Sequence, residues 1–123
     1  MAEILIIDDQ IDMRELLRDD LMDEGHRITC IGNADELVTA MDENHFDLIL
    51  LDLYLNGFEG WSLLEEIKRK TPGIPVIIVS AFTSLRDDPR IRQAEGYVTK
   101  SVYSDGVKNK INQLMRGKQK RLS

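Results

Sequence analysis

Five side chains that could take part in chemistry stand at or just after the ends of apolar segments. They are Asp8, Asp9, Asp52, Ser80 and Lys100. Three carboxylates that converge repel one another at neutral pH, so they need a cation or bound protons. A small oxygen-only cluster that leaves room for water and phosphate suits Mg²⁺. With a lysine beside it, such a cluster is suited to electrophiles that carry negative charge, of which a phosphoryl group is the obvious one.

Asp52 lies in the apolar run LILLDLYL, where an unpaired buried charge would be costly. It could be a cap or turn residue, a metal ligand or a nucleophile. Taken singly, Asp8 is as often a helix cap as a functional group, and Ser80 and Lys100 fit structural roles better than functional ones. Their joint occurrence at four strand ends favours a shared site, in which Asp52 is the nucleophile and forms an aspartyl phosphate.

The segments that must position these residues alternate between strand and helix. Short apolar runs predict five strands, at residues 3–7, 26–31, 46–52, 74–80 and 96–100. Helical spacing of apolar residues predicts helices at 12–24, 33–45, 60–70 and 103–115. This alternation predicts an α/β fold with a doubly wound, five-stranded parallel sheet and helices on both faces. In such sheets, ligands bind beyond the carboxyl ends of the strands, where the five side chains lie.

Three helix starts carry recognisable capping residues. Asn33 and Glu36 form a capping box, after which Leu37, Val38 and Met41 are predicted to face the core. Ser104 is predicted to cap the last helix.

The third start, Asp88 followed by Pro89, leaves little room before Gly96. We therefore expect a short or irregular fourth helix of one or two turns.

Composition indicates a single globular domain outside the membrane and disordered classes. The chain has 123 residues, of which 42% are hydrophobic and 31% charged, and no apolar run approaches the ~20 residues that span a bilayer. We expect a cytoplasmic protein that makes no membrane contact, with its single cysteine, Cys30, buried and reduced. Residues 1–60 hold 16 acids and 3 bases, whereas the rest hold 6 and 13. The net charge of −6 argues against direct nucleic-acid binding by this domain.

Four motifs together resemble the receiver domains of bacterial two-component response regulators, such as the chemotaxis response regulator. They are ILIIDDQ, LLDLYLNGFEG, VIIVSA and GYVTKS. The resemblance runs from ILIIDDQ to INQLM and implies the flavodoxin-like strand order 2-1-3-4-5. It implies a receiver domain at residues 1–116, with 117–123 as a basic tail or the start of a linker.

By this resemblance, Asp52 accepts a phosphoryl group from a phosphohistidine on a sensor histidine kinase or phosphotransfer protein. Asp9 and Asp52 bind Mg²⁺ directly, together with the main-chain carbonyl of Tyr54, and Asp8 acts mainly through water. The domain is then a signalling phosphoacceptor, and it catalyses only its own phosphorylation and dephosphorylation.

The resemblance also implies a switch and an output surface. Ser80 and Lys100 bind the phosphoryl oxygens, and Tyr97 is the switch aromatic that turns inward when Ser80 is drawn to the phosphate. The face formed by helix four, strand five and helix five would then contact a downstream protein, a fused effector domain or a second copy.

The chain departs from the family pattern in several places. Asn56 stands where a proline is usual and is followed by Gly57, so that Asn-Gly can make the turn by another route. Ser101 replaces the proline after the lysine. We expect the Lys100–Ser101 bond to be trans because a non-proline cis bond costs about 2.5–4 kcal/mol. Tyr54 and Phe82 occupy positions that flank the phosphoryl group in the family, and two aromatics there could exclude the attacking water and slow self-dephosphorylation. Alternatively, these rings pack loops or contact a partner.

Three other functions remain as alternatives. A haloacid-dehalogenase-like phosphatase would need an acid where Tyr54 stands, and a flavodoxin-like carrier would need a phosphate-binding loop where Asp8 and Asp9 stand. A phosphorylation-independent interaction module, or pseudo-receiver, would bind partners constitutively.

Overall fold

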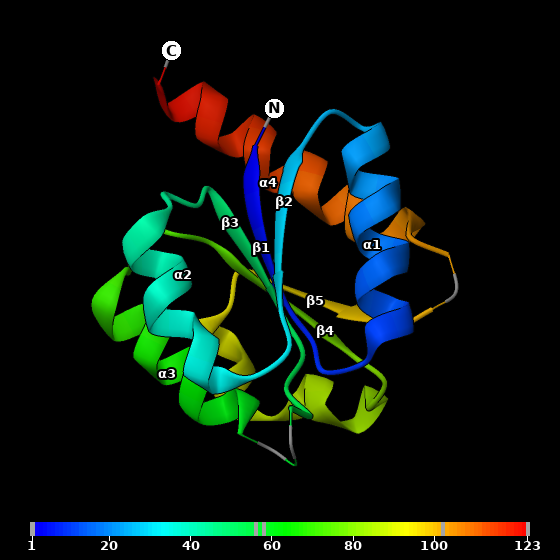
Figure 1. Ribbon diagram of the computed structural model, residues 1–123, viewed down its shortest axis with the longest axis vertical. Helices are drawn as coiled ribbons and strands as arrows, with labels where there is room; N and C mark the ends of the chain where they lie inside the picture. Colours follow the sequence, from blue (N-terminus) through cyan, green and yellow to red (C-terminus); the bar gives the residue numbers. More distant parts are fainter. Residues whose placement is uncertain (1, 56, 58, 102, 123) are drawn as a thin grey trace.

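A five-stranded parallel sheet forms the centre of the computed structural model, which describes residues 2–55, 57, 59–101 and 103–122 (Figure 1). The strands are β1 (Glu3–Ile7), β2 (Arg27–Ile31), β3 (Leu48–Leu51), β4 (Val76–Ser80) and β5 (Gly96–Thr99). Their spatial order is β2-β1-β3-β4-β5, and all four neighbouring pairs are parallel. The predicted doubly wound α/β fold and its strand order are confirmed.

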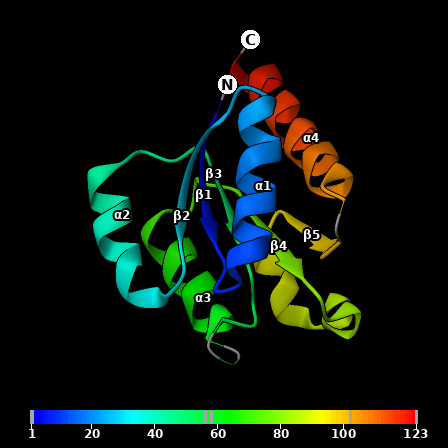
Figure 2. The ribbon, with the colours of Figure 1, turned by 45° about the vertical axis from the view of Figure 1, so that its right-hand side comes forward.

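Helices cover both faces of this sheet. The α-helices are α1 (Ile11–Asp23), α2 (Leu37–Glu43), α3 (Gly60–Lys70) and α4 (Asp105–Leu122), and three short 3₁₀ helices are η1 (Ala34–Glu36), η2 (Thr83–Asp87) and η3 (Pro89–Gln93). α1 and α4 lie on one face, and α2 and α3 lie on the other (Figures 1 and 2). Within the described ranges, no helix is both long and apolar enough to cross a membrane.

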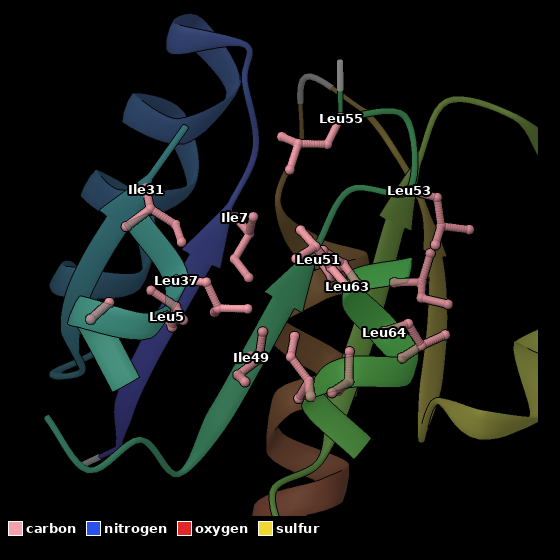
Figure 3. Close-up of a cluster of buried hydrophobic side chains, with 14 of the residues drawn as sticks. Leu5, Ile7, Ile31, Leu37, Ile49, Leu51, Leu53, Leu55, Leu63 and Leu64 are labelled. Carbon is pink, nitrogen blue, oxygen red and sulfur yellow. The ribbon is translucent and has the colours of Figure 1, made fainter. Parts of the chain in front are cut away.

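Alternating side chains of the strands divide the core into two layers. Leu5 and Ile7 of β1 join a cluster with α2 and α3, part of which is drawn in Figure 3. Ile4 and Ile6 point the other way and join a cluster with α1 and α4. Because both faces are covered, β1, β3 and β4 are apolar at almost every position, as in other central parallel strands. The two layers hold the strand ends rigidly in place.

The connection between β4 and β5 contains η2 and η3 in place of a regular fourth helix. The expected start at Asp88 is confirmed, since its Oδ1 accepts a hydrogen bond from the main-chain N–H of Arg90 at 2.9 Å, with Pro89 in the first turn. The guanidinium of Arg90 lies 4.0 Å from the ring centroid of Trp61 in α3, a cation–π contact. η3 is therefore attached to α3.

A second attachment follows at Glu95, just before β5. Its carboxylate pairs with the ammonium of Lys68 in α3 and accepts a hydrogen bond from the main-chain N–H of Val76 at 2.8 Å. The later half of the β4–β5 connection is thus held at two points. In η2, Arg86 contacts β5 and Leu85 packs against the core cluster of α2 and α3.

Several local predictions are corrected by the structure. Leu37 and Met41 face the core as predicted, but Val38 is 52% exposed, because the inward stripe of α2 runs through Leu37, Ala40 and Met41 and leaves Val38 beside it. Ser104 directly precedes α4, and its carbonyl accepts from Lys108 N–H at 2.9 Å, as at an N-cap; its hydroxyl also donates to Asp20 Oδ2 at 2.7 Å, which links α4 to α1. α4 continues to Leu122, beyond the predicted helix end at residue 115 and through most of the segment expected to be a basic tail or the start of a linker.

Other local predictions are confirmed. The side chain of Asn33 accepts from the N–H of Glu36 at 3.1 Å and so caps η1. Every peptide bond between described residues is trans, including Lys100–Ser101. Gly57 has a φ of +89°, which suits the expected turn, while Asn56 lies outside the described residues.

Candidate functional site

The structure brings the predicted site residues together at the carboxyl edge of the sheet. Asp8, Asp52 and Ser80 are 2%, 4% and 0% exposed, respectively. The side chain of Lys100 is 9% exposed, whereas Asp9 is exposed beside them. A polar group buried this deeply needs partners, and each of these four has them.

The sheet ladder fixes the two buried carboxylates on neighbouring strands. The N–H of Asp8 donates to the carbonyl of Ile31 at 3.1 Å, and the N–H of Asp52 donates to the carbonyl of Ile7 at 2.9 Å. Both residues therefore extend strand pairing by one step at the tips of β1 and β3. One carboxylate oxygen from each of Asp8, Asp9 and Asp52 lies within 4.8 Å of the others.

Each buried carboxylate divides its oxygens between the main chain and the lysine. Asp8 Oδ1 accepts from the N–H of Gln10 at 2.9 Å, and Asp52 Oδ1 accepts from the N–H of Tyr54 at 3.0 Å. Their Oδ2 atoms lie 2.9 and 3.0 Å from Lys100 Nζ. The ammonium thus bridges two carboxylates, and Asp52 is held from both sides.

The electrostatics of the cluster are set by burial and by these ion pairs. Burial raises the pKa of the Asp52 carboxyl above its usual range; the nearby charge of Asp8 adds to this rise, and Lys100 opposes it. Burial acts to lower the pKa of Lys100, but its hydrogen bonds and ion pairs with Asp8 and Asp52 outweigh burial and raise it. The lysine is therefore charged at neutral pH, and the three acids still exceed the positive charge around them.

This donor set fits a hard divalent cation. Asp8, Asp9 and Asp52 offer carboxylate oxygens within 4.8 Å of one another, and the exposure of Asp9 leaves one side open to water. A small ion that keeps several waters, such as Mg²⁺, is bound by one or two carboxylates together with phosphate oxygens. It would also relieve the excess negative charge.

Ser80 and Lys100 are joined through the main chain. The N–H of Lys100 donates to the carbonyl of Ser80 at 2.8 Å, and Ser80 Oγ accepts from the N–H of Phe82 at 3.1 Å. The end of β4, the end of β5 and the loop before η2 are therefore connected at this hydroxyl.

Two aromatic rings stand at the mouth of the site. An open pocket of about 470 Å³ is lined by Asp9, Gln10, Asp52, Tyr54, Ala81, Phe82 and Lys100. The rings of Tyr54 and Phe82 are 47% and 41% exposed, and their centroids lie 5.4 Å apart at an interplanar angle of 55°. They contact each other and line the pocket as a pair.

Tyr97 lies on the outer side of the same loop. Its hydroxyl donates to the main-chain carbonyl of Phe82, and its ring packs partly against the core cluster of α2 and α3. The guanidinium of Arg86 lies 5.5 Å from the ring centroid and also donates to Thr99 Oγ1 at 3.2 Å. Tyr97 is thus linked to the pocket through Phe82.

The main chain around Asp52 also depends on Gly60, the first residue of α3. A Cβ atom at Gly60 would lie 2.4 Å from Leu53 Cα and 2.6 Å from the Asp52 carbonyl oxygen. Sequence reasoning missed this close approach and missed Gln10. The signals were a glycine at a helix start and a polar residue directly after the acid pair.

Comparison with known families gives a match to the response regulator receiver domain over residues 4–112. The chain belongs to this family of two-component signalling domains. Membership favours a signalling receiver domain over the phosphatase and electron-carrier alternatives.

Curated relatives of this receiver domain are longer proteins. The response regulator PhoP of Pseudomonas aeruginosa is 27% identical over 116 residues, which cover 93% of this chain and 52% of PhoP. The transcriptional regulatory protein ZraR of Klebsiella oxytoca is 34% identical over 84 residues, which cover 68% of this chain and 19% of ZraR. The chain spans about half the length of PhoP and less of ZraR.

Solved structures of other receiver proteins have the same architecture. The response regulator TrrA of Thermotoga maritima, solved in complex with Mg²⁺-BeF, matches with a TM-score of 0.85 and 32% identity over 93% of this chain and 99% of TrrA. A CheY-like receiver domain protein of Methanospirillum hungatei matches with a TM-score of 0.88 and 27% identity over 98% of each chain. TrrA has also been solved in complex with the histidine kinase ThkA.

Proposed function

We propose that this receiver domain accepts a phosphoryl group on Asp52, with Mg²⁺, from a phosphohistidine of a histidine kinase or phosphotransfer protein. The observation that carries the proposal is the geometry of Asp52. It is buried at the tip of β3, held by the N–H of Tyr54 and by Lys100, and lines an open pocket. The complexes of TrrA with Mg²⁺-BeF and with ThkA support the cofactor and the partner.

In the proposed transfer, a carboxylate oxygen of Asp52 attacks phosphorus in line with the leaving nitrogen. The new O–P bond forms as the P–N bond breaks, and the bonding electrons stay on the imidazole nitrogen, which takes a proton. Lys100 pairs with one phosphoryl oxygen and the Ser80 hydroxyl donates to another. Mg²⁺ would neutralise charge on the remaining oxygens. Catalysis here consists mainly of positioning and electrostatic stabilisation.

The three acids would divide the metal ligation. Asp9 and Asp52 are the direct ligands, with the main-chain carbonyl of Tyr54 as a third. By the family resemblance, Asp8 would act through water. Its Oδ1 and Oδ2 pair with Gln10 N–H and Lys100, just as those of Asp52 pair with Tyr54 N–H and Lys100.

We predict that Asp52 takes up a phosphoryl group from a small-molecule donor. With acetyl phosphate and Mg²⁺, intact-mass analysis is expected to show a gain of one phosphoryl group in the wild-type protein and none in Asp52→Asn. Asp42→Asn, which removes an exposed carboxylate on α2, is the matched control and should behave as wild type. If the wild-type protein with Mg²⁺ gains no mass, the phosphorylation-independent module becomes the better description.

The proposed output runs through Ser80 and Tyr97. A phosphoryl group that draws the Ser80 hydroxyl inward would move the loop that also carries Phe82, and so would change the contact between Phe82 and Tyr97. The affected face consists of η2, η3, β5 and α4. A downstream protein, a fused effector domain or a second copy would bind there, as the greater length of the curated relatives suggests.

The aromatic pair at the pocket mouth is proposed to lengthen the phosphorylated state. Tyr54 and Phe82 contact each other across the pocket, so together they limit access of the water that hydrolyses the aspartyl phosphate. The double variant Tyr54→Asn, Phe82→Asn is expected to lose phosphate about 10-fold faster, which corresponds to about 1.4 kcal/mol in the barrier. The decay of phosphorylated protein after removal of donor measures this rate.

The single variants Tyr54→Asn and Phe82→Asn show how much each ring slows dephosphorylation. Each is expected to give part of the acceleration, because either ring alone covers part of the pocket. Tyr103→Asn removes a more exposed aromatic ring that does not line the pocket, and it should leave the decay unchanged. Equal decay in wild type and the double variant would contradict the proposal and leave the rings to the packing of loops or to contact with a partner.

A further inference from the structure

Gln10 contacts the site through both its main chain and its side chain. Its N–H donates to Asp8 Oδ1 at 2.9 Å, and its Oε1 lies 2.5 Å from Lys100 Nζ. It lines the same pocket as Asp9, Asp52 and Lys100. Gln10 therefore connects the first residues before α1 to the end of β5.

Gln10 occupies a position from which a side chain usually caps a helix. Gln10 is the N-cap of α1, with extended φ and ψ of −87° and 110°, and its carbonyl accepts the first helical hydrogen bond from Arg14 N–H at 3.1 Å. Serine, threonine, aspartate or asparagine would satisfy an N–H of the first turn from this position. Gln10 makes no such side-chain capping bond to the described part of α1, and its side chain reaches Lys100 instead.

The three donors of the Lys100 ammonium have three acceptors of two kinds. Two are the Oδ2 atoms of Asp8 and Asp52, and the third is the amide oxygen of Gln10. A cation or a phosphoryl group at the carboxylates changes their charge and competes with the lysine for them. The amide oxygen is neutral, and its strength as an acceptor does not depend on the state of the carboxylates.

We propose that Gln10 is a positioning residue that holds the Lys100 ammonium in the pocket while its carboxylate partners engage the metal and the phosphoryl group. The expected effect on phosphate transfer rests on the proposed function of Asp52. The effect on Lys100 itself rests only on the contact between Gln10 and Lys100.

Three variants separate this role from helix capping. Gln10→Ser can cap α1 but is too short to reach Lys100, Gln10→Met has similar length but no acceptor oxygen, and Gln10→Glu keeps an acceptor at the same reach. In Gln10→Ser, the urea midpoint is expected to stay the same or rise, while phosphorylation by acetyl phosphate slows at least 10-fold at saturating Mg²⁺. A purely structural role predicts that rate and midpoint change together or that neither changes, and either result would overturn the proposal.

A direct measurement of the ammonium does not require phosphorylation. With Mg²⁺ present, the NMR signal of the Lys100 side-chain NH₃⁺ is expected to be sharp in wild type and Gln10→Glu. In Gln10→Ser and Gln10→Met, hydrogen exchange with water should broaden it or remove it. An unchanged signal in Gln10→Ser and Gln10→Met would refute the positioning role. If wild type takes up no phosphate, the proposed function fails, whereas this signal still decides the role of Gln10.

Discussion

Replacement of Lys100 by methionine is expected to destabilise the protein by about 3–5 kcal/mol at neutral pH, the usual cost of removing one partner from a buried ion pair. The variant leaves Asp8 and Asp52, which are 2% and 4% exposed, without the ammonium that both contact. Urea unfolding at pH 7 measures the loss. Lys70→Met removes an exposed lysine that pairs with Glu66 on the same helix, and it should cost less than about 0.5 kcal/mol.

The pH dependence of the stability loss in Lys100→Met follows from the direction in which the pKa of Asp52 is shifted. Burial already raises that pKa in the wild type, and removal of Lys100 takes away the interaction that opposes the rise. A carboxyl with a raised pKa in the folded state favours folding below its unfolded pKa of about 4, and this contribution is lost as pH rises. The deficit of Lys100→Met should therefore be small at pH 4 and large at pH 7. A deficit that is independent of pH would show that lost packing, rather than charge, causes it.

Gly60→Ala is expected to destabilise the protein by about 1–3 kcal/mol, the usual cost of overpacking. An added Cβ would lie 2.4, 2.5 and 2.6 Å from main-chain atoms of Leu53 and Asp52, closer than real Cβ contacts. The strand end that carries Asp52 would have to shift, so phosphate uptake should slow as well. A loss of stability would point to the close contact at Gly60, because a glycine-to-alanine substitution inside an exposed helix normally stabilises a protein by about 1 kcal/mol.

Gly73 offers the matched control for this substitution. A Cβ there would meet nothing within 4 Å, so Gly73→Ala should change the free energy of unfolding by no more than about 0.5 kcal/mol. If Gly60→Ala proves as stable as Gly73→Ala, the turn between β3 and α3 yields without strain and the site does not depend on this glycine.

The sheet could be predicted because it depends on local patterns. Continuous apolar runs with helical segments between them specify buried parallel strands, and the connection rules leave few topologies. The acids, serine and lysine could be placed together for the same reason, since strand ends in a parallel sheet share one edge. Their positions required only correct strand boundaries, and Asp8, Asp52 and Ser80 do lie at those ends.

Features that depend on side-chain reach could not be predicted in this way. The role of Gln10 was missed, because sequence spacing does not show that its side chain reaches Lys100, 90 positions later. Val38 was placed inward with Leu37 and Met41, but the buried stripe of α2 continues from Leu37 to Ala40 and Met41, so Val38 lies outside it. The contact of Arg90 with Trp61 likewise joins residues that no local pattern relates.

The β4–β5 connection is attached to the rest of the molecule along both of its parts. Arg90 and Glu95 fix the later part to Trp61, Lys68 and Val76. The earlier part contacts β5 through Phe82 and Arg86 and the core through Leu85. Fixing the backbone of one residue in a single conformation costs about 1–2 kcal/mol of entropy. Because both parts are already ordered, a rearrangement that begins at Ser80 would exchange one set of contacts for another and would not have to order a disordered loop.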